Sequence, residues 1–91
     1  MRVLIAGIDG YLGWPLALHL TARGHTVAGI DSFQRRAWVA ETGSQSAMPI
    51  RSMNERLAAF EERFGRRLKF YDGNLCDYDT VVRMLCEFEP D

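Results

Sequence analysis

Apolar residues in the first third of the chain change their spacing in a way that predicts a strand, a helix and a second strand. The run "RVLIAG" is short, nearly continuous and ends in glycine, which is typical of a strand buried on both faces of a parallel sheet. Residues 11–23 then carry leucine at every fourth position, the spacing of one helix face. These residues are Leu12, Leu16 and Leu20, with Ala17 alongside. "TVAGID" follows as a second short strand, so the segment predicts a βαβ unit with parallel strands.

Three glycines, Gly7, Gly10 and Gly13, join the first strand to the helix. Glycines in such a turn allow tight curvature, close approach of a ligand to the backbone and close packing of the helix on the strand. Unpaired N–H groups and the positive end of the helix dipole favour an anion here, and a pyrophosphate is the expected ligand. Pro15 fits the first turn of this helix, and Gly24 supplies a left-handed C-terminal cap.

An acidic residue, Asp31, ends the second strand eighteen residues after the last of these glycines. A carboxylate at this position can accept hydrogen bonds from the adenosine ribose and repels a 2′-phosphate, which favours NAD over NADP. Arg35 and Arg36 temper that preference, because a nearby guanidinium can receive a phosphate. The alternative is a plain βαβ unit in which the glycines serve only the turn. A P-loop is excluded, because Lys69 is the only lysine and no Gly-Lys-Ser/Thr follows the glycines.

The middle of the chain predicts two more helices. The long, weakly periodic connection between the second strand and Ser52 is of the kind that is usually functional or mobile, and it holds a short helix over residues 34–41. Within that helix, Trp38 is expected either to join the core, the favoured interpretation, or to line a nucleotide pocket. Ser52 and Glu55 have the spacing of a capping box and start the next helix, which Gly65 ends. Its apolar stripe is Met53, Leu57, Phe60 and Phe64, and its adjacent carboxylates Glu61 and Glu62 are expected to face solvent.

The last third of the chain predicts a strand and a helix. "RLKFYDGNL" reads as the third strand with its turn. Asp77 is the expected N-cap of a last helix, which Pro90 ends. The buried side of this helix is predicted to be Val81, Met84, Leu85 and Phe88.

Composition and charge exclude several classes of function. A chain of 91 residues with 47% hydrophobic and 25% charged residues forms one small globular domain at most. A net charge of -1 argues against a nucleic-acid partner held by bulk positive charge. The N-terminal apolar run is too short for a signal sequence or a membrane span, so we expect a cytoplasmic protein with no membrane partner. Cys76 and Cys86 form no metal-binding or CxxC pattern and are expected to be reduced, partly buried thiols.

The G-x-x-G-x-x-G spacing resembles the extended short-chain dehydrogenase/reductase superfamily, which contains NAD-dependent sugar-nucleotide epimerases and dehydratases. The segments "GIDGYLGWPLALHL", "DSFQRR", "GSQSAMPI" and "YDGNLCDYD" are similar, in the same order, to the UDP-sulfoquinovose synthase branch. The resemblance covers essentially all 91 residues. It implies an α/β, Rossmann-like parallel sheet in three α/β/α layers, the N-terminal half of a doubly wound fold. Enzymes of that branch bind NAD, oxidise UDP-glucose transiently at C4, add sulfite and reduce the ring again.

The same resemblance implies the residues that would bind NAD. It assigns the pyrophosphate to the turn formed by Gly7, Gly10, Tyr11, Leu12 and Gly13. It assigns the adenosine ribose to Asp31 with Ser32 and Phe33 beside it, and the adenine or a phosphate to Arg36. Relatives commonly have an aspartate in contact with the adenine where this chain has Asn74, followed by Leu75. The Asn74 amide oxygen can still accept a hydrogen bond, but the side chain also donates and carries no charge.

No catalytic or metal-binding residues are predicted. Enzymes of the resembled family use a Tyr-x-x-x-Lys pair as general base, and the 91 residues contain none. His19 and His25 lie in the first helix and in the turn after it, remote from a site of hydride transfer. We therefore expect residues 1–91 to be an incomplete NAD-binding segment, lacking the fourth strand onward and the substrate domain. On its own it would bind NAD weakly and catalyse nothing, and a nucleotide sugar would bind only in an intact homologue.

A different class of function remains open: a non-catalytic nucleotide-sensing or interaction module that keeps the fold. Such a module would have a paired or covered sheet edge. A fragment of an enzyme would instead expose the edge of its first strand, and it would aggregate or form a homodimer.

Overall fold

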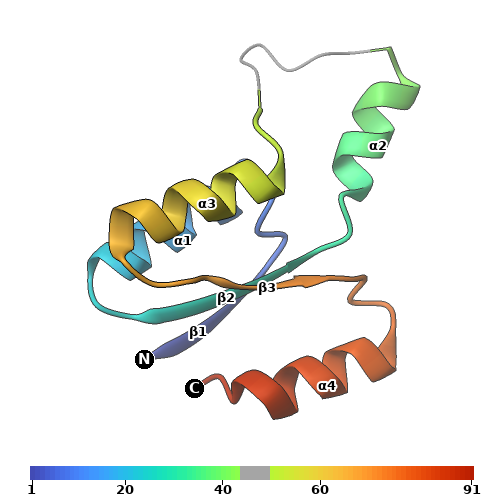
Figure 1. The fold of residues 1–91 in the computed structure, drawn as a ribbon. Coiled ribbons are helices and arrows are strands. Elements are labelled where there is room, and N and C mark those ends of the chain that lie inside the picture. Colours follow the sequence, from blue (N-terminus) through green and yellow to red (C-terminus); the bar gives the residue numbers. More distant parts are fainter. Residues whose placement is uncertain (44–49) are drawn as a thin grey trace.

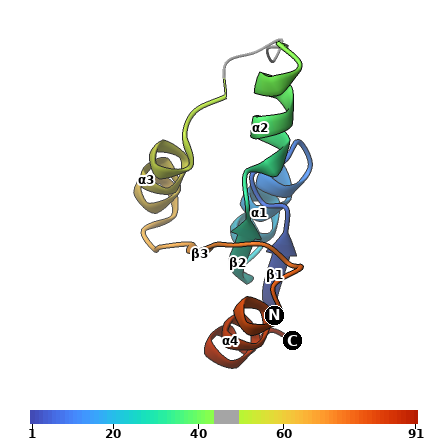
Figure 2. The same cartoon turned by 90° about the vertical axis from the view of Figure 1, so that its right-hand side faces the viewer.

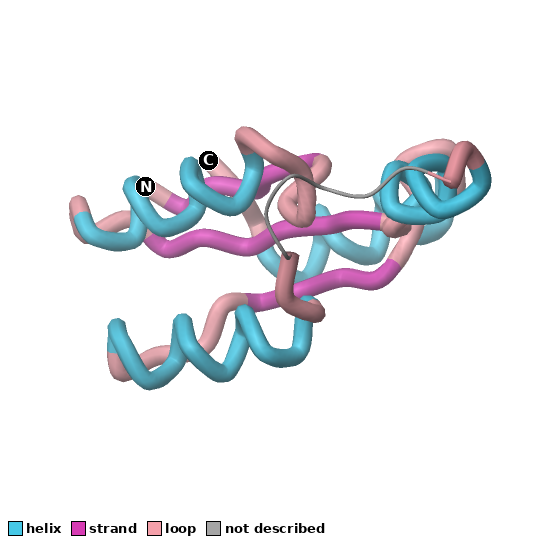
Figure 3. Tube along the Cα trace, turned by 90° about the horizontal axis from the view of Figure 1, so that it is seen from above, coloured by secondary structure: helices cyan, strands magenta, loops and turns pink. Residues whose placement is uncertain are grey.

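Three parallel strands form the centre of the protein (Figure 1). The structure is a computed structural model that describes residues 1–43 and 50–91. The strands are β1 (Arg2–Ala6), β2 (Thr26–Asp31) and β3 (Lys69–Asp72), and they pair in the order β1-β2-β3. Figure 3 shows them side by side from above. The register sets Ala6 beside Ile30 and Asp31 beside Asp72, so the carboxyl ends of all three strands meet at one end of the sheet.

Helices cover both faces of this sheet, which confirms the predicted three-layer α/β/α class. The helices are α1 (Gly13–Ala22), α2 (Gln34–Glu41), α3 (Met53–Phe64) and α4 (Tyr78–Phe88). Helices α1 and α3 lie on one face and α4 on the other (Figures 1 and 2). Helix α2 stands beyond the carboxyl end of β2 and buries none of its residues. None of the helices in the described part of the chain is both long and apolar enough to cross a membrane.

Each face of the sheet has its own hydrophobic core. The α1/α3 face buries Ile5, Ile8, Ala17, Val27, Met53, Phe60 and Leu68. The α4 face buries Ala28, Ile30, Tyr71, Met84 and Phe88. Ile8 of the glycine turn is fully buried over β2, where a Cβ at Gly29 would lie 2.7 Å from the Ile8 Cβ. The glycine in β2 therefore makes the space into which the turn packs.

The buried face of α1 differs from the predicted leucine stripe. Leu12 precedes the helix and is exposed, as is Leu16, whereas Leu20 packs on the core. The fully buried positions are the small residues Gly13, Ala17 and Thr21. The prediction was right for Ala17 and Leu20 and wrong for Leu12 and Leu16, because α1 lies so close to the sheet and the glycine turn that small side chains fill the contact.

Helix α3 matches its predicted pattern. Ser52 caps it by accepting the Glu55 N–H at 3.2 Å, and Gly65 ends it with a left-handed φ of 68°. Met53 and Phe60 are buried, and the rest of the predicted stripe packs against the same core. Glu61 and Glu62 are exposed, as predicted.

The other predicted burials are corrected in part. Asp77 stands at the N-cap of α4, but its carboxylate accepts from the Thr80 hydroxyl at 2.7 Å and caps no backbone N–H. Leu85 is exposed, because α4 contacts the sheet with a narrow stripe that Met84 and Phe88 fill.

Cys76 and Cys86 are both free and exposed, so the prediction of partial burial was wrong. Cys76 lies in the turn before α4, and Cys86 lies outside the contact stripe of that helix. Trp38 is 56% exposed and does not join the core, because α2 buries none of its residues.

Strand β1 lies at an edge of the sheet and is less buried than predicted. Ile5 is buried, but Val3 and Leu4 are only half-buried, since β2 is the only strand paired with β1 in the described residues. At the other edge of β1, the Asp91 N–H donates to the Arg2 carbonyl at 2.9 Å and the Arg2 N–H donates to Asp91 Oδ2 at 2.7 Å. The two ends of the chain therefore lie side by side (Figures 1 and 2).

The motif "GSQSAMPI" lies mostly outside the described residues, which omit 44–49.

Candidate functional site

The glycine turn between β1 and α1 depends on two backbone features. Gly7 has a φ of 73°, a left-handed conformation that side chains disfavour. A Cβ at Gly13 would lie 2.8 Å from the Ile8 Cα and closer still to the Gly7 carbonyl oxygen. Gly10 closes the turn, with its N–H donating to the same carbonyl at 3.0 Å. The first and third glycines therefore provide conformation and close approach, as the sequence predicts.

Three consecutive amides at the start of α1 are open to a ligand. Within residues 1–43 and 50–91, the N–H groups of Tyr11, Leu12 and Gly13 donate to no other group. The Tyr11 and Leu12 side chains are exposed and leave the backbone accessible. Amides at a helix N-terminus, together with the helix dipole, bind anions such as phosphate. The turn is therefore chemically suited to a pyrophosphate, the ligand predicted from the sequence.

Asp31 ties the glycine turn to the segment after β2. Its Oδ2 accepts the Asp9 N–H and its Oδ1 accepts the Phe33 N–H, each at 2.8 Å. An ionised carboxylate has about four acceptor positions, so roughly two remain for other donors such as ribose hydroxyls. Asp31 can thus shape the turn and still bind a ligand.

Phe33 and Ser32 follow Asp31 in the predicted order. Phe33 has a left-handed φ of 60°, which costs a non-glycine residue roughly 1 kcal/mol. The hydrogen bond to Asp31 stabilises this conformation, and the Phe33 ring packs 5.7 Å from that of Phe70 on β3. Ser32 is exposed beside it.

A hollow of about 130 Å³ opens where the three strands end. It is lined by Gly7, Ile30, Asp31, Ser32, Gly73, Asn74 and Leu75. In open α/β sheets, ligands bind at this end of the strands. The Asn74 amide oxygen accepts the Cys76 N–H at 2.9 Å, so it already holds the local turn. The structure thus brings the glycine turn, Asp31, Ser32 and the Asn74 turn around one space.

Asp9, the acid inside the glycine turn, was not among the site residues predicted from the sequence. Asp9 is only 9% exposed. Its carboxylate accepts two hydrogen bonds from Arg36, through Nε and, at 2.6 Å, through Nη2, and Arg56 Nη1 lies 3.3 Å from its Oδ1. Arg36, predicted to reach the adenine or a phosphate, is thus paired with Asp9. Arg56 lies 47 residues from Asp9, and no local pattern links such positions.

The surroundings shift the pKa values of the two arginines in opposite directions. Hydrogen bonding to Asp9 raises the pKa of Arg36 above its ordinary value, against an opposing effect of burial, and the charges of Asp9 and Asp31 add to the increase. Burial lowers the pKa of Arg56, and the charge of Asp9 opposes this decrease. Both guanidiniums remain charged at neutral pH. The Asp9 carboxylate is thus the shared counter-ion of two arginines.

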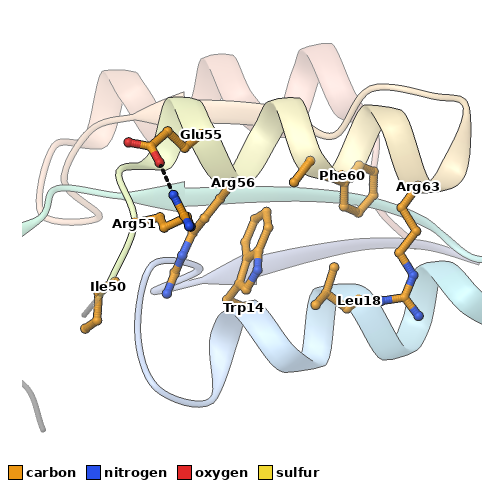
Figure 4. Close-up of a pocket in the computed structure, with 9 residues that line it drawn as sticks. Trp14, Leu18, Ile50, Arg51, Glu55, Arg56, Phe60 and Arg63 are labelled. Carbon is orange, nitrogen blue, oxygen red and sulfur yellow. Dashed lines mark hydrogen bonds and ion pairs between the residues drawn. The ribbon is translucent and has the colours of Figure 1, made fainter. Parts of the chain in front are cut away.

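A larger hollow, of about 350 Å³, lies between α1 and α3 (Figure 4). It has an apolar floor that includes Trp14, Leu18 and Phe60, with arginines around it. The Arg56 guanidinium lies 5.3 Å from the centre of the Trp14 ring. None of the predicted cofactor-binding residues lines this hollow, and Arg56 links it to Asp9.

Known proteins match the chain along its whole length. A family model described as the NAD dependent epimerase/dehydratase family matches residues 3–91. A UDP-sulfoquinovose synthase from Sulfolobus acidocaldarius is 42% identical over 91 residues, all of this chain and 23% of the relative. The chloroplastic UDP-sulfoquinovose synthase of Spinacia oleracea is 33% identical over 90 residues, 99% of this chain and 19% of the relative.

The chain thus spans about a fifth to a quarter of the length of these curated relatives. The family match nevertheless includes the glycine turn, Asp31 and the hollow at the strand ends. The parallel three-layer fold agrees with that match. The chain belongs to the NAD dependent epimerase/dehydratase family.

Proposed function

We propose that this chain is the NAD-binding part of an enzyme that modifies a sugar nucleotide, of the UDP-sulfoquinovose synthase kind. Residues 1–91 would form an incomplete NAD-binding segment, and the remaining sheet and the substrate domain would come from further sequence. One observation carries the proposal: three amides at the start of α1 have no partner in the described residues, and they belong to the turn that Asp31, at the end of β2, holds through the Asp9 N–H. The similarity to two UDP-sulfoquinovose synthases supports UDP-glucose and sulfite as the substrates of the whole enzyme.

Each part of NAD has residues that suit it. The amides of Tyr11, Leu12 and Gly13 would donate to the pyrophosphate, and Gly7 and Gly10 would shape the turn. Asp31 would accept from the adenosine ribose hydroxyls through the acceptor positions that its two backbone bonds leave free.

The adenine would lie in the hollow at the strand ends. Ser32, Asn74 and Leu75 line this hollow, and the Phe33 turn stands next to it. When bound, NAD would take a hydride from the sugar and return it later. This chain's own task is to bind and orient the cofactor, since its 91 residues contain no Tyr-x-x-x-Lys pair to move the proton.

The proposal is tested by isothermal titration of the purified chain with NAD, ADP-ribose and NADP. We expect saturable binding of NAD and ADP-ribose and weaker binding of NADP. Asp31→Ala should weaken NAD binding by about tenfold or more, because it removes a charged acceptor. Asp79→Ala, a matched change at an exposed position of α4, should leave the affinity for NAD unchanged.

Circular dichroism decides whether each variant is folded. Because Asp31 also accepts two backbone N–H groups, Asp31→Asn serves as a second variant that keeps the shape of the side chain. A folded wild-type chain that gives no heat with NAD or ADP-ribose would overturn the proposal, and the glycines would then serve only the turn.

A further inference from the structure

The Arg36 guanidinium is occupied although it stands beside the segment proposed to hold the adenosine ribose. Two of its nitrogens donate to the Asp9 carboxylate, and Nη2 also donates to the Arg51 carbonyl oxygen at 2.9 Å. Its charge is close enough to Asp31 for that carboxylate to stabilise it. An arginine near a ribose-binding acid is the usual receptor for the 2′-phosphate of NADP.

We propose that Asp9 is a positioning residue for cofactor specificity: it holds Arg36 in an ion pair and so denies that guanidinium to the 2′-phosphate of NADP. This inference rests on the proposed function, since it concerns selection between two cofactors of the same site. Asp9, within the glycine turn, is then a second determinant of NAD preference besides Asp31.

The ion pair is hard for a phosphate to displace. The Asp9 side chain is 6% exposed, and Arg56 contacts the same carboxylate from α3. The Arg56 side chain is 18% exposed, and its guanidinium lies over the Trp14 ring (Figure 4). Releasing Arg36 would take two charge-assisted hydrogen bonds from the nearly buried Asp9 carboxylate, which is unfavourable even with Arg56 still in contact. A phosphate that recruited Arg36 would leave Asp9 with Arg56 alone.

Asp9 also contributes through its backbone. Its N–H donates to Asp31 Oδ2, so the residue that occupies Arg36 also orients the acid proposed to bind the ribose. The Asp31 carboxylate repels a 2′-phosphate, whereas the charge of Asp9 is balanced by its two arginines. The turn thereby combines an occupied cation with a repelling carboxylate at the place where NADP differs from NAD.

The test is titration of the 91-residue chain with NAD and NADP in wild type, Asp9→Asn, Arg36→Ala and the double variant. Asp9→Asn keeps the side-chain shape and the backbone N–H but removes the charge. We expect it to raise the affinity for NADP relative to NAD by about tenfold, because a released guanidinium can form charge-assisted hydrogen bonds to phosphate. Adding Arg36→Ala should abolish that gain. Glu61→Gln is the matched control, since it neutralises an exposed carboxylate paired with Arg67 far from the turn.

Arg36→Ala in the wild-type background tests the inference even if Asp9→Asn does not fold. An arginine already occupied by Asp9 adds nothing to NADP binding, so the ratio of the two affinities should stay within about twofold. A selective loss of NADP binding in Arg36→Ala would overturn the inference, as would an Asp9→Asn variant that binds NAD with an unchanged ratio. Failure of the folded wild type to bind either NAD or ADP-ribose has a different meaning, because it overturns the proposed function and this inference with it.

Discussion

At the residue scale, Gly13 occupies the first position of a helix, where alanine would ordinarily be the more stable choice. Alanine is favoured over glycine within a helix by about 0.5–1 kcal/mol. Here the Cβ would collide with the Gly7 carbonyl and with Ile8 Cα. Overpacking of this kind costs about 1–3 kcal/mol, more than the helix gains, so tertiary contact outweighs helix propensity.

Gly13→Ala should therefore destabilise the chain by about 2 kcal/mol and weaken NAD binding, because α1 must move away from the turn. The measurement is urea unfolding together with titration of NAD. Gly65→Ala is the control: this residue has a left-handed φ, unlike Gly13, and a Cβ there meets nothing within 4 Å. It should cost about 1 kcal/mol and leave NAD binding intact. Equal effects of the two substitutions on binding would contradict the role of close approach at Gly13.

At the element scale, α4 is attached to the sheet by its core stripe and by Arg2 at the start of β1. The Arg2 guanidinium donates to the carbonyls of Phe88, at 2.9 Å from Nε, and Glu89, at 3.2 Å, and lies 4.5 Å from the centre of the Phe88 ring. These carbonyls belong to the last turn of the helix, where intrahelical donors are lacking. The side chain therefore satisfies the helix end and fixes it beside the chain's N-terminus.

Arg2→Ala should lower the free energy of unfolding by about 2 kcal/mol, since it removes charged hydrogen bonds to carbonyls that have no other donor in the described structure. Hydrogen exchange should show the loss of protection concentrated in α4. Arg67→Ala, which removes an exposed ion pair with Glu61, should cost less than about 0.5 kcal/mol. A loss of protection spread evenly over the sheet would argue against this attachment.

The elements were largely predictable from sequence, whereas their buried faces were less so. Helix α2 has the predicted bounds 34–41, and the three strands lie where their apolar runs predict. Hydrophobic spacing finds a helix but does not say how closely it approaches its neighbour. Leu12 and Leu16 were wrong for that reason, since close packing selected Gly13 and Thr21 beside the predicted Ala17. Leu85 and Cys86 were wrong because the contact stripe of α4 is narrow, and Cys76 was wrong because it lies in the exposed turn before that helix.

Part of the candidate site was also predictable from the sequence, and part was not. The glycine turn and Asp31 follow from local sequence, because their spacing reflects one continuous βαβ unit. The pairing of Asp9 with Arg36 and Arg56 does not, since it joins the turn, α2 and α3. Such long-range ion pairs depend on how the elements pack and leave no periodic signal in the chain.

At the scale of the whole molecule, the outer edge of β1 is the feature that distinguishes a fragment of an enzyme from a self-contained module. The backbone N–H and C=O groups of the odd-numbered residues of β1 point toward β2, because the Thr26 N–H donates to the Met1 carbonyl and the Gly7 N–H donates to the Ile30 carbonyl. The backbone groups of Arg2, Leu4 and Ala6 therefore point to the outer edge. Asp91 pairs with Arg2. No strand in the described part of the chain pairs with the other two residues.

An unpaired strand edge is a template for another strand, so we expect the 91-residue chain to self-associate through β1. Sedimentation at increasing concentration should show the mass rising from 10.4 kDa toward twice that value. Ala6→Lys should weaken this association by about tenfold, since a lysine on an edge strand opposes its pairing with another strand. Ala37→Lys adds the same charge on the exposed α2 and should leave association unchanged. A chain that stays monomeric at all concentrations would instead favour the nucleotide-sensing module, because an edge that does not recruit a partner must be covered in solution.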